Sequence, residues 1–206
     1  MSATWAMVDD ERREFVALAE SLTPAQWDAP SLCEGWRVRD VVGHVIWVST
    51  NRLAATVGKV LLSGLRLNTV FAREAVAIGS RSTDELVNRL RPIIGTTPSY
   101  PGSSATIFLA DTLMHQQDIR RPLGLNRTIA AERVRPCLDL TKGNNHTGAK
   151  KRIAGLRLFA LDLDWSHGTG PEVKGTGEQL LMVMNGRMSV VGELSGAGKA
   201  ALAERD

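Results

Sequence analysis

The architecture of this chain can be predicted from one stretch, ATIFLADTLMHQQDIRR, which spans residues 105–121. It follows a proline-rich loop and a serine cap, Ser103 or Ser104, and it ends before a proline, so we expect one helix here. Asp111 and His115 stand four residues apart, which places them on one face of that helix, one turn apart. A carboxylate and an imidazole placed in this way can grip one metal ion.

His44 is the third candidate ligand, on a second expected helix that starts at Val38 and continues to Leu53. Gly43 beside it would let another backbone or a ligand approach closely. Two histidines and one carboxylate leave a coordination position open, as catalytic zinc sites require. Each of these residues also has an interpretation without a metal. Asp111 and His115 could be a surface pair, and His44 could be a buried histidine bonded to a carbonyl.

Further helices are expected along the first two thirds of the chain, and the pattern changes after the polar stretch 142–148. Residues 155–165 partly alternate apolar and polar, which predicts a strand, and residues 166–177 are glycine-rich turn material. We therefore expect a mainly α chain: a helical metal-binding domain over residues 1–148 and a small C-terminal α/β extension over residues 149–206, packed on it. The other expected helices cover residues 11–22, 68–78, 83–94, 130–140, 178–186 and 198–204, and Thr23-Pro24 is expected to open a short turn or helix.

Composition indicates a globular protein. The chain has 206 residues, of which 43% are hydrophobic and 23% are charged, as in ordinary soluble domains. The net charge of +3 comes from scattered basic residues, so no nucleic-acid partner is expected. No apolar run is long enough to span a bilayer, and the first residues lack the features of a signal peptide. We expect a cytoplasmic protein without a membrane partner, and an apolar bundle face could support a homodimer.

The remaining cysteines and histidines add little chemistry at this stage. Cys33 and Cys137 lie far apart in the chain, which is typical of a reducing compartment. Neither has a base beside it in sequence, so a protein nucleophile is weakly supported. His146 and His167 lie in glycine-rich loops and are expected to be exposed.

One acid and three arginines could assist a metal centre. Asp118 shares the helix face of Asp111 and His115, so it could orient a ligating imidazole or form a salt bridge with Arg120 or Arg121. Arg120, Arg121 and Arg187 are candidates for anchoring a carboxylate of a thiol or substrate. Arginines near helix ends are also commonly solvated surface charges.

Three motifs carry a resemblance to a known family. They are LTPAQW at residues 22–27, SLCEGWRVRDVVGH at residues 31–44 and DTLMHQQDIRRPLG at residues 111–124. Together with the tail from residue 155 through 185–187, they resemble the mycothiol-dependent maleylpyruvate isomerase family, which belongs to the DinB-like metalloenzyme superfamily. The resemblance covers nearly the whole chain.

The resemblance implies a DinB-like four-helix bundle that holds one divalent metal, usually zinc, at His44, Asp111 and His115. The characterised isomerases have glutamate where this chain has Asp111, and they are expected to carry a larger C-terminal domain than the tail here. Trp27 and Trp36 belong to the family motif. The physical reading of Trp36 is that it packs over the start of the His44 helix and sets its angle.

These observations lead to one main hypothesis and two alternatives. The main one is a mycothiol S-transferase or isomerase, in which a low-molecular-weight thiol becomes a metal-bound thiolate and attacks an electrophile. Asp118 and Arg187 are then the catalytic candidates, and Arg120 and Arg121 the candidates for binding the cosubstrate. The first alternative is a metal-dependent hydrolase with Asp118 as general base. The second is a non-catalytic binding or stress-response protein with a degraded metal site.

Overall fold

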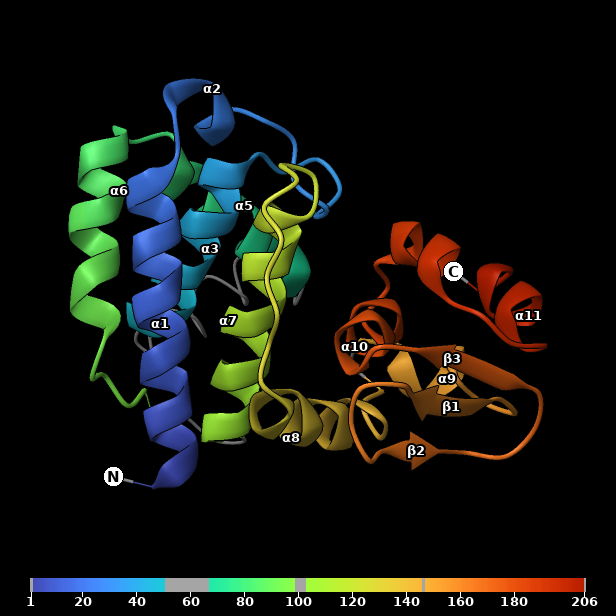
Figure 1. Cartoon of the computed structure of the whole chain (residues 1–206). Helices are drawn as coiled ribbons and strands as arrows, with labels where there is room; N and C mark the ends of the chain where they lie inside the picture. Colours follow the sequence, from blue (N-terminus) through green and yellow to red (C-terminus); the bar gives the residue numbers. More distant parts are fainter. Residues whose placement is uncertain (1, 51–66, 99–102, 146, 206) are drawn as a thin grey trace. The chain divides into compact units, whose positions relative to one another are not determined.

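The structure, a computed structural model, describes residues 2–50, 67–98, 103–145 and 147–205 (Figure 1). The chain divides into two compact units, Met1–Asn126 and Arg127–Asp206. The fold is mainly helical with one small three-stranded sheet, which confirms the expected class. The predicted continuation of the His44 helix to Leu53 lies partly outside the described residues, and so does His146.

The first unit contains the helices that carry all three candidate ligands. They are α1 (Ala3–Ser21), α2 (Pro24–Trp27), α3 (Val38–Thr50), α5 (Leu67–Gly79), α6 (Thr83–Leu90), a 3-10 turn (Arg91–Ile93) and α7 (Ala105–Arg120). Helix α3 packs on α5, α6 and α7, and α1 packs on α6 and α7. The interior is lined by apolar side chains of α3 that are fully buried, such as Val41 and Val45.

Side-chain caps determine where several of these helices begin. The hydroxyl of Ser104 accepts from the amide of Ile107 at 3.3 Å, and α7 starts where the sequence predicts it. The expected cap at Thr23 is present as a reciprocal capping box with Gln26. Helix α1 begins earlier than predicted, because Ser2 caps it by accepting from the amide of Trp5 at 3.4 Å.

Two glycines let α3 and α5 cross at close range. A Cβ atom at Gly43 would collide with the carbonyl oxygen of Ala75 and lie 2.8 Å from the amide nitrogen of Gly79. At Gly79, an added Cβ would lie 2.8 Å from the carbonyl oxygen of Arg39. The sequence suggested a backbone or a ligand beside Gly43, and the structure shows the backbone of α5 there.

The second unit is the small α/β extension. Its elements are α8 (Ala131–Thr141), α9 (Ala149–Arg152), β1 (Arg157–Ala160), β2 (Ser166–His167), β3 (Glu172–Gly175), α10 (Gly177–Met184), a 3-10 helix (Met188–Glu193) and α11 (Lys199–Ala203). The sheet order is β2-β1-β3, with β1 antiparallel to β2 and parallel to β3. The expected strand is confirmed as β1, whereas β2 and β3 lie in residues predicted to be turns only.

The observed division falls after Asn126, whereas the sequence placed it after residue 148. The difference is α8, which was assigned to the helical half but packs on α10 in the second unit. The contact forms at Gly177, where an added Cβ would meet side-chain atoms of Val134 and Leu138. Periodicity identified this helix but could not indicate which apolar face it covers.

In the described part of the chain, no helix combines the length and the apolar character that crossing a bilayer requires.

Gly43→Ala tests the close crossing of α3 and α5. We expect a loss of about 1–3 kcal/mol or more in the free energy of unfolding, because the methyl group must push two helix backbones apart. Urea unfolding followed by circular dichroism measures this. Gly192→Ala is the matched control, since an added Cβ there meets no atom within 4 Å, and we expect a change within about 0.5 kcal/mol. Equal stability of the two variants would contradict the packing argument.

Candidate metal centre

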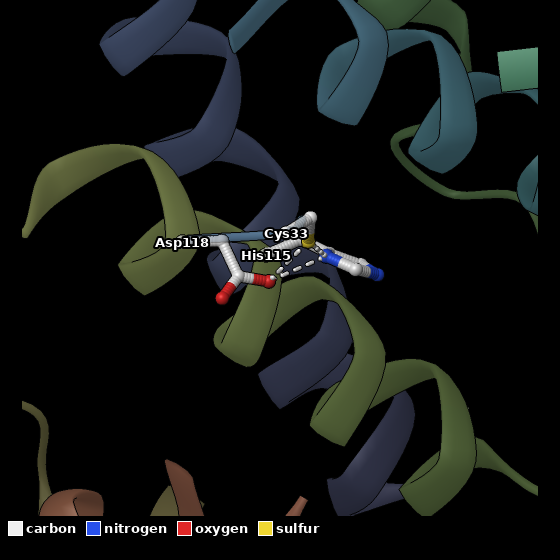
Figure 2. A group of neighbouring side chains, drawn as sticks. All are labelled: Cys33, His115 and Asp118. Atoms are coloured by element: carbon white, nitrogen blue, oxygen red, sulfur yellow. Dashed lines mark hydrogen bonds and ion pairs between the residues drawn. The ribbon is translucent and has the colours of Figure 1, made fainter. Parts of the chain in front are cut away.

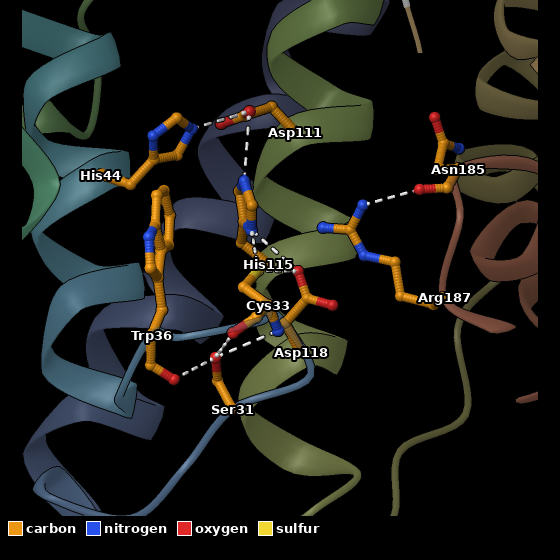
Figure 3. Close-up of polar contacts among 9 residues, drawn as sticks. All are labelled: Ser31, Cys33, Trp36, His44, Asp111, His115, Asp118, Asn185 and Arg187. Atoms are coloured by element: carbon orange, nitrogen blue, oxygen red, sulfur yellow. Dashed lines mark hydrogen bonds and ion pairs between the residues drawn. The ribbon is translucent and has the colours of Figure 1, made fainter. Parts of the chain in front are cut away.

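The three predicted ligands meet in the first unit, between α3 and α7. The Nε2 atoms of His44 and His115 each lie 3.5 Å from the same carboxylate oxygen, Oδ1 of Asp111. The two imidazole rings are 4.7 Å apart between centroids. Figure 3 shows both rings turned toward Asp111. Helical spacing on α7 aligns Asp111 with His115, and the packing of α3 on α7 supplies His44.

The spacing of these atoms suits a divalent ion. Nitrogen and oxygen ligands lie about 2.0–2.1 Å from tetrahedral zinc, and two such ligands are then about 3.3 Å apart. The observed separations of 3.5 Å are close to that value, and the three ligand atoms all lie within 4.8 Å of one another. Both histidines are 7% exposed. The residues therefore fit a metal centre of two imidazoles and one carboxylate.

His115 is held at both edges of its ring. Its Nδ1 atom lies 2.9 Å from Oδ2 of Asp118, and Asp118 is fully buried. Because a carboxylate only accepts, Nδ1 carries the proton of this hydrogen bond. In neutral His115 the lone pair is then on Nε2, which faces Asp111. Two acceptors facing each other need a cation between them, either a proton or a metal ion.

The same contacts shift the pKa values of His115 and Asp111. Burial opposes the charged form of His115, but the negative charge of Asp111 and hydrogen bonds to Asp111, Asp118 and Cys33 raise its pKa well above the ordinary imidazole value. Burial likewise opposes ionised Asp111, yet the positive charge of His115 and bonds from both histidines hold the pKa of that carboxyl far below its usual range. A metal ion would have to displace the proton on His115.

Cys33 joins this cluster, although sequence reasoning missed it. Its Sγ donates to Oδ2 of Asp118 at 3.1 Å and lies 3.8 Å from Nδ1 of His115 (Figure 2). No base stands beside this cysteine in the sequence, but His115 and Asp118 lie beside it in space. No local signal reveals the contact, because 82 residues separate Cys33 from His115.

The loop over residues 30–37 connects the two sides of the centre. The amide of Leu32 donates to the backbone oxygen of Asp118 at 3.0 Å, so the loop is bound to α7. The hydroxyl of Ser31 donates to the carbonyl of Trp36 at 2.8 Å, which closes the loop on itself. The indole of Trp36 then lies against the imidazole of His44, 5.3 Å between centroids. Trp36 therefore packs on the candidate ligand itself, as Figure 3 shows.

A second aromatic residue also contacts His44. The ring of Phe71 on α5 lies edge-on to the imidazole at 5.9 Å, and Trp47 packs on Phe71 at 4.9 Å. Contacts with two aromatic rings, those of Trp36 and Phe71, restrict how His44 can rotate.

The three arginines proposed from sequence each make contacts of their own. Nε of Arg120 donates to Oε1 of Gln116 at 3.4 Å, within a polar layer between α1 and α7. Arg121 ends α7, where its amide donates to the carbonyl of Gln117. Arg187 belongs to the second unit, and its guanidinium donates to the carbonyl of Asn185 at 2.9 Å. His167 is half-buried in β2 of the same unit.

The fold and the site together define a helical bundle that presents two histidines and one carboxylate. Residues 8–92 match the model of the family described as Mycothiol maleylpyruvate isomerase N-terminal domain. This part of the chain is therefore similar to that family, in line with the resemblance of its motifs. The matched segment includes His44 and Cys33 and ends before Asp111.

A solved structure supports the fold. The chain resembles the crystal structure of a histidine-to-alanine mutant of mycothiol-dependent maleylpyruvate isomerase, with a TM-score of 0.63 and 12% sequence identity. The match covers 95% of this chain and 92% of that chain. The expected difference in the size of the C-terminal part was therefore wrong. No curated protein matches the chain.

Cys33→Ala tests whether the thiol helps to hold the centre. We expect zinc affinity to fall by about tenfold, because the groups that orient a ligating histidine commonly contribute this much. Cys33→Ser keeps a donor for Asp118 and should bind zinc nearly as wild type does. Cys137→Ala is the matched control, since that buried thiol donates to a backbone carbonyl of α8. Competition against a chromophoric chelator measures each dissociation constant, and unchanged affinity in Cys33→Ala would refute this role.

The raised pKa of His115 predicts how zinc binding depends on pH. Zinc must displace the proton on His115, so affinity should rise by up to about tenfold per pH unit until pH exceeds that pKa. In metal-free protein, the free energy of unfolding changes with pH in the opposite direction. The stability from protonated His115 is complete below about pH 6.5, the unfolded value, and is lost as pH rises through the folded pKa. Calorimetry in buffers of different ionisation enthalpy counts the released protons, and pH-independent affinity would contradict this assignment.

Proposed function

We propose that this protein is a metal-dependent enzyme, with zinc as the expected metal. It would use a low-molecular-weight thiol either as an S-transferase, which joins the thiol to an electrophilic substrate, or as an isomerase of such a substrate. The observation that carries this proposal is the shared position of the two Nε2 atoms, each 3.5 Å from one oxygen of Asp111. The family supports mycothiol as the thiol, because the similar crystal structure is of a mycothiol-dependent isomerase.

Each residue of the centre has a part in this proposal. His44, Asp111 and His115 would hold the ion and leave a coordination position open. Asp118 keeps the proton of His115 on Nδ1, so that Nε2 can ligate. When bound, a divalent ion would supply the positive charge at which a thiol loses its proton. No protein nucleophile is then needed.

Asp111 is one point of difference, because the resemblance implies glutamate at this position in the characterised isomerases. Aspartate is one methylene shorter, so the ion would lie nearer to α7 or be bound more weakly. Its carboxylate has its ion pairs with both imidazoles, which supports a working ligand rather than a degraded site. The non-catalytic alternative loses its main argument for this reason.

The hydrolase alternative requires a general base at the open position. Asp118 is bonded to Nδ1 of His115, which is the opposite edge of the ring from Nε2. This position favours an orienting role for Asp118 and therefore favours the thiol-using enzyme.

Other parts of the proposal rest on the sequence alone. Arg187, Arg120 and Arg121 stay as proposed contacts to the substrate or cosubstrate. A cytoplasmic location and a homodimer stay predictions from sequence.

Metal content tests the proposal directly. We expect about one equivalent of zinc by mass spectrometry in protein purified without a metal-affinity tag. His44→Ala and His115→Ala should each lose it while remaining folded by circular dichroism. His167→Ala is the matched control, because His167 lies in the other unit and should leave the zinc content unchanged. Metal-loaded protein should then lower the pKa of added mycothiol or a thiol analogue, measured by thiolate absorbance.

Two results would overturn the proposal. Wild-type protein that takes up no metal after exposure to zinc and dialysis would remove both enzyme mechanisms. A protein that binds zinc but leaves the titration of every thiol tested unchanged would point to the hydrolase.

A further inference from the structure

Arg12 is a charged residue in the interior of the bundle that the sequence analysis did not single out. It lies on α1, and its side chain is 0% exposed. One terminal nitrogen, Nη1, donates to the carbonyl of Thr96 at 2.7 Å and lies 3.5 Å from Oδ1 of Asp9. Asp9 also accepts from the amide of Gly95 at 2.9 Å. These contacts hold the turn after α6 against α1 through one end of the guanidinium.

The opposite edge of the same guanidinium makes no hydrogen bond to the described residues. Nε and Nη2 are both buried, and neither has a hydrogen-bond partner among the described residues. Buried donors without partners are uncommon and need an explanation. These two nitrogens form one side of a planar fork, with two parallel N–H bonds. That edge matches a carboxylate, which can accept both bonds at once.

Contacts between α1 and α7 place this edge near the metal centre. Trp5 on α1 stacks on Phe108 of α7 at 5.5 Å, and further along Gln116 donates to Oε2 of Glu11 at 2.8 Å. Side chains on a helix point toward its N-terminus, and the guanidinium of Arg12 lies 5.9 Å from the ring of Trp5. It therefore lies at the level of α7 between Phe108 and Gln116, the segment that carries Asp111.

Electrostatics give a second indication of this proximity. Burial lowers the pKa of Arg12, whereas the negative charges of Asp9 and Asp111 oppose that change. Asp111 does not complete the fork, because its ion pairs are with His44 and His115. The permanent positive charge of Arg12 thus lies within electrostatic reach of the candidate ligand set. Two of its N–H donors make no hydrogen bond to the described residues.

We propose that the Nε and Nη2 edge of Arg12 is a carboxylate-binding subsite next to the metal centre. It would take a carboxylate of the electrophilic substrate through two parallel, charge-assisted hydrogen bonds. The assignment of that carboxylate to a substrate rests on the proposed function, but the binding itself does not require a metal. The competing explanation is that Arg12 only ties the turn after α6 to α1.

Metal-free protein and acetate separate these explanations. Zinc is removed with a chelator, which is then dialysed away because it is itself a carboxylate. The proton on Nε of Arg12 is followed in proton–nitrogen correlation spectra as sodium acetate is added, with sodium chloride at equal ionic strength as the control. We expect the Nε–H resonance to move with acetate in a saturable way and not with chloride. A resonance that stays in place throughout the acetate titration overturns the proposal.

Two variants make the assignment specific. Arg12→Lys keeps the charge but loses the fork, and acetate binding should weaken by about tenfold or more. Because this variant has no Nε–H of Arg12, acetate binding to all three proteins is compared through the indole N–H of Trp5, whose ring lies 5.9 Å from the guanidinium. Asp9→Asn removes the competing charge and keeps an oxygen for the amide of Gly95, so acetate should bind more tightly than in wild type. If Arg12→Lys does not fold, Asp9→Asn and the wild-type resonance decide alone. Equal acetate affinity in wild type and both variants would mean nonspecific binding only and would refute the subsite.

The source of the carboxylate is tested next with crotonate and crotonamide, electrophiles that differ only in the carboxylate. Crotonate should displace acetate, whereas crotonamide should not. If both fail while acetate binds, the carboxylate belongs to another ligand and the substrate assignment is wrong. If the protein takes up no zinc, the acetate experiments can still support or reject the subsite. If acetate does not bind, zinc uptake can still support the metal centre. The two proposals can therefore be rejected separately.

Discussion

The hydrogen bond between Nδ1 of His115 and Oδ2 of Asp118, 2.9 Å long, decides what the rest of the centre can do. It fixes which nitrogen of the imidazole faces Asp111 and His44, and so whether a lone pair is available there. Asp118 is itself held by the thiol of Cys33 and, through its backbone, by the amide of Leu32. The orientation of this candidate ligand on α7 therefore depends on the loop that leads into α3.

This dependence explains why a short loop matters to both helices. The 30–37 loop reaches His115 through Asp118 and reaches His44 through the indole of Trp36. A shift of α3 relative to α7 would disturb both contacts at once. The close crossing at Gly43 limits such a shift, because α3 lies against the backbone of α5 there. Packing and hydrogen bonding thus support the same arrangement of ligands, which is how a precise site is held on rigid elements.

Sequence periodicity was sufficient for the parts of this structure that depend on one helix at a time. The i, i+4 spacing of Asp111 and His115 and the serine cap of α7 are local features, and both were read correctly. His44 needed only the further assumption that a bundle turns its apolar stripes inward. Cys33, Arg12 and the packing of α8 could not be read in this way, because their partners are distant in the chain. Arg12 is hidden most completely, since a lone arginine in a helix normally indicates a solvated face.

Buried polar side chains on α1 and α7 also bear on function. Arg12, Glu11, Gln116 and Asp118 are all fully buried, and burying such groups costs free energy unless they are paired. Glu11 and Gln116 pair with each other, and Asp118 pairs with His115 and Cys33. A purely structural bundle would be at least as stable with apolar residues at these positions. Keeping one cation with two unpartnered donors within electrostatic reach of a carboxylate shared by two histidines is therefore better explained by a ligand that carries negative charge. A divalent ion on neutral imidazoles and one carboxylate keeps a net positive charge, which favours a thiolate or a carboxylate at the centre over a neutral ligand.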